Sequence, residues 1–214
     1  MRQVHQLVFA STNIDKYREF EALFKALPGV SLIPAENVLR NPEKIGYVET
    51  FNTYLENSAA KARLANQGCH YPCFADDTGL EVEALGGKPG IHTARFAQLP
   101  ALERSRSKQD EANLAKLLEQ MKGQSNRNAR FVTSVVLIVE GILVHGTGIL
   151  EGTIAESPRG THGFGYDPLF IPKGSERTLA EMSDEEKNNL SHRARALHDL
   201  TLQLQARGIV LAKP

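Results

Sequence analysis

The sequence has no excess of charge of either sign, since Lys and Arg together number 25 and Asp and Glu together also number 25. A chain without net charge has no overall electrostatic field that attracts nucleic acid or an anionic membrane. The densest basic run, residues 104–108, is short and is followed by acidic residues, which indicates a solvated approach to a helix. We therefore expect no nucleic-acid partner, and any anionic ligand must be bound by local basic residues.

Cysteines and long apolar runs are also few. The two cysteines, Cys69 and Cys73, flank His70, but a second ligand pair and the usual zinc spacing are missing. Two reduced thiols near a strand are therefore favoured over a metal site.

The apolar run at residues 4–10 is too short for a signal peptide or a membrane span. A cytoplasmic protein without a membrane partner is the resulting expectation.

The first part of the chain alternates between strand and helix patterns. The apolar run at residues 4–10 predicts a strand, and apolar residues recur at helical spacing over residues 17–27, after the capping residues Ser11-Thr12-Asn13. Residues 30–33 predict another strand. A capping-box spacing then opens a second helix over residues 53–68, which ends at a glycine.

Strand patterns dominate the second part. The remaining predicted elements are strand segments at residues 73–75, 80–85, 131–139, 142–145 and 149–154, a tight turn at residues 140–141, helices at residues 110–121 and from Ser183 onward, and a loop at residues 158–172. Strands that first alternate with helices and then follow one another predict a mixed-sheet α/β fold.

Two neighbouring acids, Asp76 and Asp77, lie in a predicted turn with Thr78 and Gly79, between two strand segments. Neighbouring side chains of an extended chain point in opposite directions, so the two acids can serve separate roles, one binding a metal while the other orients it. Mg²⁺ is usually bound by one or two carboxylates together with phosphates and waters. Taken alone, however, the pair is more simply interpreted as a solvated acidic turn.

The polar turn from Ser11 to Lys16 leads from the first strand into its helix. A helix N-terminus offers backbone N–H groups and a positive dipole end, so this turn can bind phosphate, with Lys16 adding a point charge. The glycine-rich run of a Walker loop is absent. The simpler alternative is a plain helix cap with Lys16 on the surface.

The segment Gly163-Phe164-Gly165-Tyr166-Asp167-Pro168 combines two glycines with two aromatic residues. Glycine lets the backbone approach a ligand closely, and an aromatic ring offers a stacking face for a base. A tight turn whose aromatic residues fill the core explains the same pattern equally well.

Three basic residues, Lys187, His192 and Arg193, follow one another near the C-terminus. On one continuous helix they would point in three different directions. If the helix instead breaks near Asn188-Asn189 and Ser191 caps a new helix, His192 and Arg193 lie in its first turn, where two cations require an anion. A solvent-facing basic patch is the alternative.

These segments, in this order, closely resemble the inosine triphosphate pyrophosphatase family, also called the non-standard purine nucleoside triphosphate pyrophosphatases. The resemblance spans nearly the whole chain. Its motifs are residues 11–16, Glu56-Asn57 with Lys61, residues 75–82, residues 84–87 leading to residues 89–91 and Ala94-Arg95, residues 163–168, and Lys187 with Ser191-His192-Arg193. Several motifs in one register outweigh the simpler interpretation of each.

The resemblance implies a fold and an activity. The fold is an elongated α/β protein, residues 1–214 forming a single pyrophosphatase domain, with a curved central mixed β-sheet flanked by helices, two lobes with a cleft between them, and usually a homodimer. The activity is hydrolysis of ITP, dITP or XTP to the monophosphate and pyrophosphate. Asp77 is implied as the general base and shares Mg²⁺ with Glu49, while Asp76 has a metal-orienting role.

The implied substrate-binding residues are Ser11, Thr12, Asn13, Ile14, Asp15, Lys16, Thr78, Phe164, Gly165, Tyr166, Asp167, Lys187, His192 and Arg193. Phe164 is implied as the stacking partner of the purine. Lys61 and Arg95 are either phosphate ligands or structural partners of the acids. Two alternatives to this activity remain open: a module that senses purine nucleotides without cleaving them, and a related pyrophosphatase that acts on pyrimidine or methylated nucleotides.

Overall fold

The protein is described by a computed structural model that covers residues 2–27, 29–100 and 105–211. The chain forms two compact units. Unit 1 comprises Met1–Asp77, Thr133–Gly148 and His192–Pro214, and unit 2 comprises Thr78–Val132 and Ile149–Ser191. Strands β4, β6 and β7 contribute residues to both units.

Unit 1 contains a parallel core of strands. Its elements are β1 (Arg2–Val4), β2 (Gln6–Phe9), α1 (Ile14–Lys25), β3 (Ser31–Pro34), the 3-10 helices η1 (Ala35–Asn37) and η2 (Pro42–Val48), α2 (Tyr54–Cys69), the first half of β4 (Cys73–Val82), parts of β6 (Asn128–Val139) and β7 (Ile142–Ile154), α5 (His192–Gln205) and β9 (Ile209–Leu211). Strand β2 pairs in parallel with β3 and with β4, and β1 pairs in parallel with β9. The order β3-β2-β4-β6-β7 places β4 in the interior of the sheet.

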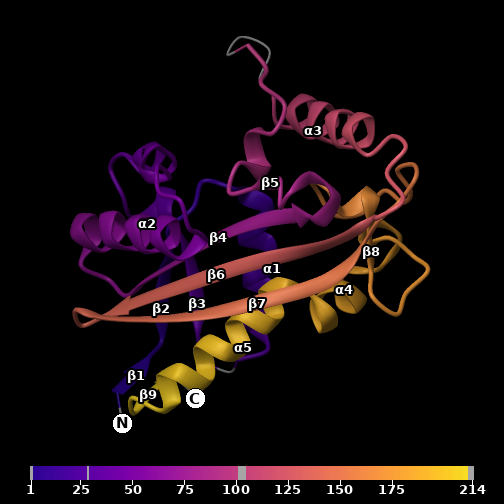
Figure 1. The fold of residues 1–214 in the computed structure, drawn as a ribbon. Helices are drawn as coiled ribbons and strands as arrows, with labels where there is room; N and C mark the ends of the chain where they lie inside the picture. Colours follow the sequence, from indigo (N-terminus) through magenta and orange to yellow (C-terminus); the bar gives the residue numbers. More distant parts are fainter. Residues whose placement is uncertain (1, 28, 101–104, 212–214) are drawn as a thin grey trace. The chain divides into compact units, whose positions relative to one another are not determined.

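Helices cover both faces of the strands of unit 1, and Figure 1 shows α2 and α5 on opposite sides of them. On one face, Phe74 of β4 packs with α1 and α5 in a cluster that includes Phe20 and Leu200. On the other face, Cys73 and Ala75 pack with the alanines of α2. Because strand side chains alternate between faces, β4 is in contact with a different helix layer at each successive residue.

Two glycines of β7 allow α5 to lie against the strand backbone. A Cβ at Gly146 would come within 2.5 Å of the Ala196 carbonyl oxygen and 2.8 Å of the Leu200 Cα. A Cβ at Gly148 would overlap with the carbonyl oxygen of His192 and the backbone nitrogen of Ala196. The absence of a side chain at these two positions therefore permits the close approach of α5.

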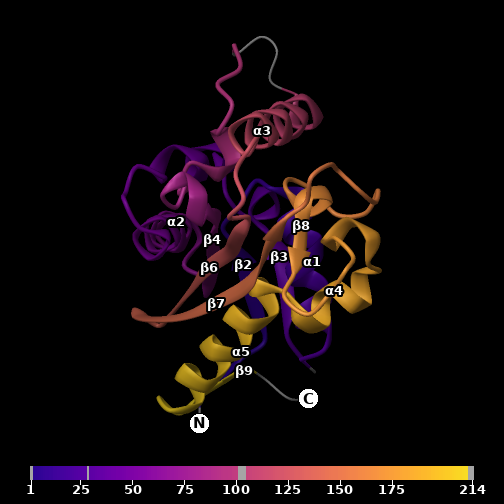
Figure 2. The same ribbon diagram turned by 45° about the vertical axis from the view of Figure 1, so that its right-hand side comes forward.

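Unit 2 has an antiparallel sheet around a separate core. Its elements are the second half of β4, η3 (Glu83–Leu85), β5 (Pro89–Gly90), η4 (Thr93–Arg95), α3 (Arg106–Gln120), the remaining parts of β6 and β7, η6 (Asp167–Leu169), β8 (Phe170–Pro172), η7 (Leu179–Glu181) and α4 (Asp184–Leu190). Strand β4 pairs with β5 and β7 pairs with β8, both antiparallel. The orange part of the ribbon in Figure 2 contains β8 and α4. Apolar residues of α3, including Leu117, pack with Leu80, Phe131 and Phe170 in the core of this unit.

Most of the predicted elements are confirmed. Helix α1 follows the Ser11-Thr12-Asn13 turn, and α2 begins after Thr53, whose side chain accepts a hydrogen bond from the Glu56 backbone N–H. Glu140 and Gly141 both have positive φ and form the turn between β6 and β7. The mixed parallel and antiparallel pairing confirms the α/β prediction.

Among the described residues, no helix is both long and apolar enough to span a membrane.

Several local predictions are wrong. The strand predicted over residues 80–85 ends at Val82, and residues 83–85 form the 3-10 helix η3. Strand β4 runs without interruption from Cys73 to Val82, so Asp76-Asp77-Thr78-Gly79 is not a turn. Residues 142–154 form one strand rather than two segments. Helix α3 begins at Arg106, before the predicted start. The segment predicted as a loop includes the short strand β8. Part of the basic run, at Arg104, lies outside the described residues.

Replacement of Gly148 by alanine should destabilise the protein, because the new methyl group would collide with the backbone of α5. Overpacking of this kind costs about 1–3 kcal/mol. The matched control is Gly46→Ala, since a Cβ at Gly46 meets nothing within 4 Å. Urea unfolding should show a lower free energy of unfolding for Gly148→Ala and little change for the control. Equal stabilities of the two variants would contradict this account of how α5 packs.

Candidate active site

The two acids of β4 are buried, and strand alternation places them on opposite faces. Asp76 is 0% and Asp77 7% exposed, so the solvated acidic turn is wrong. Asp76 continues the face of Phe74, and its Oδ2 lies 2.7 Å from Nζ of Lys16 in α1. Asp77 faces α2 and accepts a hydrogen bond of 3.0 Å from the side-chain amide of Asn57. The two carboxylates therefore have different partners.

The first turn of α1 brings Lys16 to Asp76. The side chain of Asn13 caps the helix and accepts hydrogen bonds of 3.0 Å from the backbone N–H groups of Asp15 and Lys16. The Ser11 hydroxyl accepts a bond of 3.2 Å from the Asn13 backbone N–H. The turn is thus a helix cap, as the simpler interpretation predicted, but Lys16 is not a surface residue, because its side chain is only 14% exposed.

A buried lysine on α2 joins a second acid to Asp77. Lys61 is 2% exposed, and its Nζ donates a hydrogen bond of 2.6 Å to Oε1 of Glu49. The same ammonium lies 3.9 Å from Oδ1 of Asp77. Asn57 and Lys61 are four residues apart in α2, so they lie on the same face of the helix, toward β4.

The charges around the pair shift the two carboxyl pKa values in opposite directions. Burial opposes ionisation of Asp76, but Lys16, Lys61 and Arg193 outweigh it and lower the pKa of Asp76. Burial raises the pKa of Asp77, and the neighbouring lysines offset only part of that effect. Asp76 is therefore held as a carboxylate, whereas Asp77 is the more basic of the two acids.

Lys61 and Glu49 are both held in their charged forms. Burial favours the neutral form of each, but their mutual attraction outweighs it, so the pKa of Lys61 is raised and that of Glu49 is lowered. Asp77 adds to the effect on Lys61, and Lys16 adds to the effect on Glu49. The Lys61 ammonium is thus shared between the Glu49 carboxylate, whose pKa is lowered, and Asp77, whose pKa stays raised.

The two basic residues at the start of α5 are buried in unit 1. Helix α4 ends at Leu190 and α5 begins at His192, so the predicted break is confirmed, but it falls at Ser191 rather than at Asn188-Asn189. His192 is 1% and Arg193 4% exposed, which excludes a solvent-facing patch. Glu19 of α1 supplies an anion here, because its Oε2 accepts a bond of 2.6 Å from Arg193.

The aromatic turn of unit 2 is organised by a buried carboxylate. Asp167 is 3% exposed, and its Oδ2 accepts hydrogen bonds of 2.9 Å from the Phe164 backbone N–H and 2.5 Å from Nζ of Lys187. The Lys187 ammonium lies 5.2 Å from the centre of the Phe164 ring, and the Arg106 guanidinium lies 5.3 Å from it. Two cations therefore contact a half-buried ring.

Tyr166 and Gly165 fix this turn to the rest of unit 2. Tyr166 is 3% exposed and its hydroxyl donates a hydrogen bond of 3.0 Å to the Thr93 carbonyl. Burial, together with the charge of Asp110, raises the pKa of Tyr166. The Gly165 backbone N–H donates a bond of 3.2 Å to Asp110. The Tyr166 side chain thus fills the core, as one of the two interpretations of this segment predicted.

Each unit carries one group of the predicted site residues. Unit 1 holds residues 11–16, Glu49, Lys61, Asp76, Asp77, His192 and Arg193, and unit 2 holds Thr78, Arg95, residues 164–167 and Lys187. Thr78 is buried, whereas Arg95 is exposed in η4. Sequence reasoning missed Glu19, Arg106 and Asp110, the last two because the helix that carries both was predicted to begin only at residue 110.

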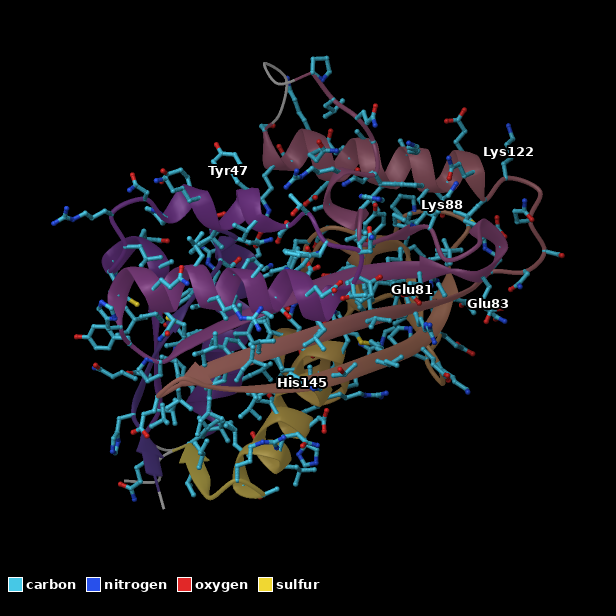
Figure 3. The ribbon with its side chains drawn as sticks, turned by 60° about the vertical axis from the view of Figure 1, so that its left-hand side comes forward. Tyr47, Glu81, Glu83, Lys88, Lys122 and His145 are labelled. Carbon is cyan, nitrogen blue, oxygen red and sulfur yellow. The ribbon has the colours of Figure 1, made fainter. Side chains whose placement is uncertain are left out.

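Two further acids follow Asp77 in the sequence, Glu81 in β4 and Glu83 in η3, and both have polar partners in unit 2. Figure 3 labels Glu81 and Glu83 near the end of β4. Oε2 of Glu81 accepts a hydrogen bond of 2.7 Å from Nε of Arg130 and forms an ion pair with the same guanidinium, and Glu83 accepts bonds of 3.1 Å from the side chains of Asn126 and Asn128. These acids therefore stabilise the strand ends of unit 2.

The donor set of unit 1 suits a hard cation. Among the described residues no group of three or more His, Cys, Asp or Glu side chains has the arrangement of a complete metal site. Glu49 and Asp77 nevertheless converge on the single ammonium of Lys61, and both offer carboxylate oxygens. Mg²⁺ typically takes one or two protein carboxylates and completes its shell with phosphate and water, so these residues fit Mg²⁺.

Replacement of Lys16 by methionine should destabilise the substrate-free protein in a pH-dependent way. Because the folded-state pKa of Asp76 is lowered, its ionised form stabilises the fold above the unfolded-state pKa, and this contribution is lost as the pH falls through the folded-state pKa. Removal of one partner of a buried pair costs about 3–5 kcal/mol. Urea unfolding should therefore show a large loss at about pH 7 that persists to about pH 4, and the loss should shrink only as the pH falls further below the unfolded-state pKa of about 3.9.

Lys25→Met is the matched control for this change, because Lys25 lies in the same helix and forms an exposed pair with Glu21. An exposed pair of this kind contributes about 0–1 kcal/mol. A loss for Lys16→Met that is independent of pH would exclude Asp76 as its cause.

Comparisons with known proteins identify the family of this chain. The Ham1 family model matches residues 7–203 of the chain. A dITP/XTP pyrophosphatase of Aquifex aeolicus is 41% identical over 197 residues, covering 91% of this chain and 94% of that protein. Another from Deinococcus deserti is 45% identical over 194 residues, covering 90% of this chain and 86% of that protein. The structure of a HAM1 protein from Coxiella burnetii matches with a TM-score of 0.75 at 32% identity, covering 96% of this chain and all of that one. The chain therefore belongs to the Ham1 family.

Proposed function

We propose that this protein hydrolyses non-standard purine nucleoside triphosphates, such as dITP, XTP and ITP, to the monophosphate and pyrophosphate. Curated relatives that are about 40% identical over most of the chain carry the name dITP/XTP pyrophosphatase. The observation that carries the proposal is the difference between the partners of the two acids: Asp76 is paired with Lys16 at 2.7 Å, whereas Asp77 shares the ammonium of Lys61 with Glu49 and has a raised pKa. This arrangement suits a general base beside a structural acid.

In the proposed reaction, Asp77 accepts a proton from the water that attacks the α-phosphorus. Its raised pKa makes the carboxylate a better proton acceptor than Asp76. Asn57 holds the Asp77 carboxylate by a hydrogen bond of 3.0 Å. Glu49 and Asp77 would hold Mg²⁺, which when bound supplies positive charge to the phosphates. Lys16 and residues 11–15 are assigned to phosphate binding, and Lys16 offsets the charge of the departing pyrophosphate.

We assign recognition of the purine to Phe164, with Lys187 and Asp167 fixing the turn that carries it. A ring flanked by cations is an electron-rich surface on which a base can stack. Hypoxanthine and xanthine present a carbonyl at C6, where adenine presents an amino group. A donor from His192 or Arg193 would pair with the carbonyl and leave adenine mismatched, at about 1–3 kcal/mol per unpaired group.

We further propose that both units act together as one pyrophosphatase domain, in a cytoplasmic homodimer. The resemblance of the motifs to the family supports this assembly. A purine-sensing module without turnover would have no need of a basic Asp77, and a pyrimidine or methyl-nucleotide pyrophosphatase would differ in base preference. Pyrophosphate release from dITP, XTP, ITP, GTP, ATP and dUTP, compared in one assay with Mg²⁺, separates these alternatives.

Asp77→Asn should remove most of the turnover without loss of stability. General base catalysis typically contributes 10²–10⁴-fold, roughly the decrease expected in kcat for dITP. Because the pKa of Asp77 is raised, the fold disfavours its charge above that pKa, and a neutral amide should not lower the free energy of unfolding. Asp76→Asn, in contrast, should lower the free energy of unfolding, because the ionised Asp76 stabilises the fold. Pyrophosphate release and urea unfolding measure the two effects.

Asp184→Asn is the control for these variants, because Asp184 is exposed in the first turn of α4. It should retain wild-type turnover. Near-normal activity of Asp77→Asn would remove Asp77 from the role of base, whereas a loss shared by Asp184→Asn would indicate a general defect.

Phe164→Ala should raise KM for dITP more than it lowers kcat. Loss of a base–aromatic stack costs about 1–3 kcal/mol, which corresponds to a rise in KM of about tenfold or more. Tyr71→Ala, which removes an aromatic side chain that is 46% exposed in unit 1, should leave KM unchanged. Steady-state kinetics with dITP tests the assignment, and an unchanged KM for Phe164→Ala would place the purine elsewhere.

A further inference from the structure

The two cysteines of the chain lie close together in unit 1, outside the proposed catalytic group. Both are free thiols, and their Sγ atoms are 3.6 Å apart. Cys69 is the last residue of α2, and Cys73 is the first residue of β4. The proposed pyrophosphatase reaction uses neither of them.

The turn between the two elements directs the thiols toward each other. His70 has a positive φ of 59° and ends α2 in the left-handed conformation. The Cys69 thiol donates to the Ala65 carbonyl at 3.1 Å, and the Cys73 thiol donates to the Tyr71 carbonyl at 3.3 Å. With both thiols held in this way, closing the gap to the S–S bond length of about 2.05 Å requires only a small movement of each sulfur.

The two thiols differ in their access to solvent. Cys73 is fully buried at 0% exposure, and burial, followed by the proximity of Cys69, raises its pKa. Cys69 is partly exposed at the end of the helix. A small oxidant therefore reaches Cys69 first, while Cys73 is available only to a group that is already beside it.

We propose that Cys69 and Cys73 form a reversible redox pair that closes into a disulfide on exposure to a hydroperoxide. The Cys69 sulfur attacks the peroxide and becomes a sulfenic acid, with release of one water when hydrogen peroxide is the oxidant. The Cys73 sulfur then displaces the sulfenic oxygen, which leaves as a second water with the Cys73 proton. Two thiols are oxidised by two electrons, and one peroxide is reduced to two waters.

The bond would join the end of α2 to the start of β4. These are the elements that carry Lys61 and Asp77, but both residues lie at a distance in sequence from the thiols. The disulfide should therefore keep the end of α2 joined to the start of β4 in the unfolded chain and raise the melting temperature. We do not expect it to displace Lys61 or Asp77. The site stands independently of the proposed catalytic function, because its detection needs no activity measurement.

Thiol counting on the full-length protein tests the pair directly, because the sequence contains only two cysteines. The reduced protein is treated with hydrogen peroxide, and free thiols are then counted with a chromogenic disulfide reagent after unfolding. We expect the count to fall from two to none, with a mass decrease of two hydrogens in a monomeric chain, and to return to two with dithiothreitol. The oxidised form should also melt at a higher temperature than the reduced form.

Single Cys→Ser variants separate the roles of the two thiols. In Cys73→Ser, Cys69 has no partner, so its sulfenic acid should be trapped by dimedone. In Cys69→Ser, the buried Cys73 should keep its thiol under the same treatment. Retention of both thiols in the wild type, addition of oxygen in place of hydrogen loss, chains linked to one another on a non-reducing gel, or an unchanged melting temperature would each overturn the proposal.

Discussion

The burial of two neighbouring carboxylates in one interior strand is the constraint on which unit 1 depends. A buried carboxylate needs a countercharge or hydrogen bonds, and otherwise it takes up a proton. Because Asp76 and Asp77 point to opposite faces of β4, their nearest polar partners come from different helices, although the charges of Lys16 and Lys61 act on both acids. Helix α1 therefore contributes Lys16 on one face, and α2 contributes Asn57 and Lys61 on the other. The helices that cover the sheet also complete its charge balance.

This division gives two chemically identical side chains different properties. Asp76 faces Lys16 and is further stabilised by the charge of Arg193, so its ionised form strengthens the fold. Asp77 shares Lys61 with Glu49, and the incomplete compensation leaves it more basic. A difference of this kind separates an acid that holds a site together from one that can exchange protons with a substrate. The fold produces this difference because the two side chains leave β4 in opposite directions and meet different neighbours.

Local signals in the sequence were sufficient for much of the fold, but long-range contacts were not visible in it. Caps such as Thr53 mark helix ends, because they act on the next few residues. The segment Asp76–Gly79 has turn-like composition, but it lies in a strand between β2 and β6, which are distant in sequence, so it was predicted wrongly. Lys16 was recognised as part of a site but not as the partner of Asp76. Arg106 was missed because its basic neighbours suggest solvent, whereas its guanidinium contacts Phe164.

The glycines at positions 146 and 148 place a restriction on how this sequence can vary. They lie on the same face of β7, and at each the backbone of α5 occupies the space in which a side chain would lie. Neither position can change unless the helix moves outward, and such a movement would also displace His192 and Arg193 at its start. A Gly-x-Gly pattern inside a strand can therefore indicate a helix lying directly on the backbone. Its position within the strand distinguishes it from the glycine loops that follow a strand and precede a phosphate-binding helix.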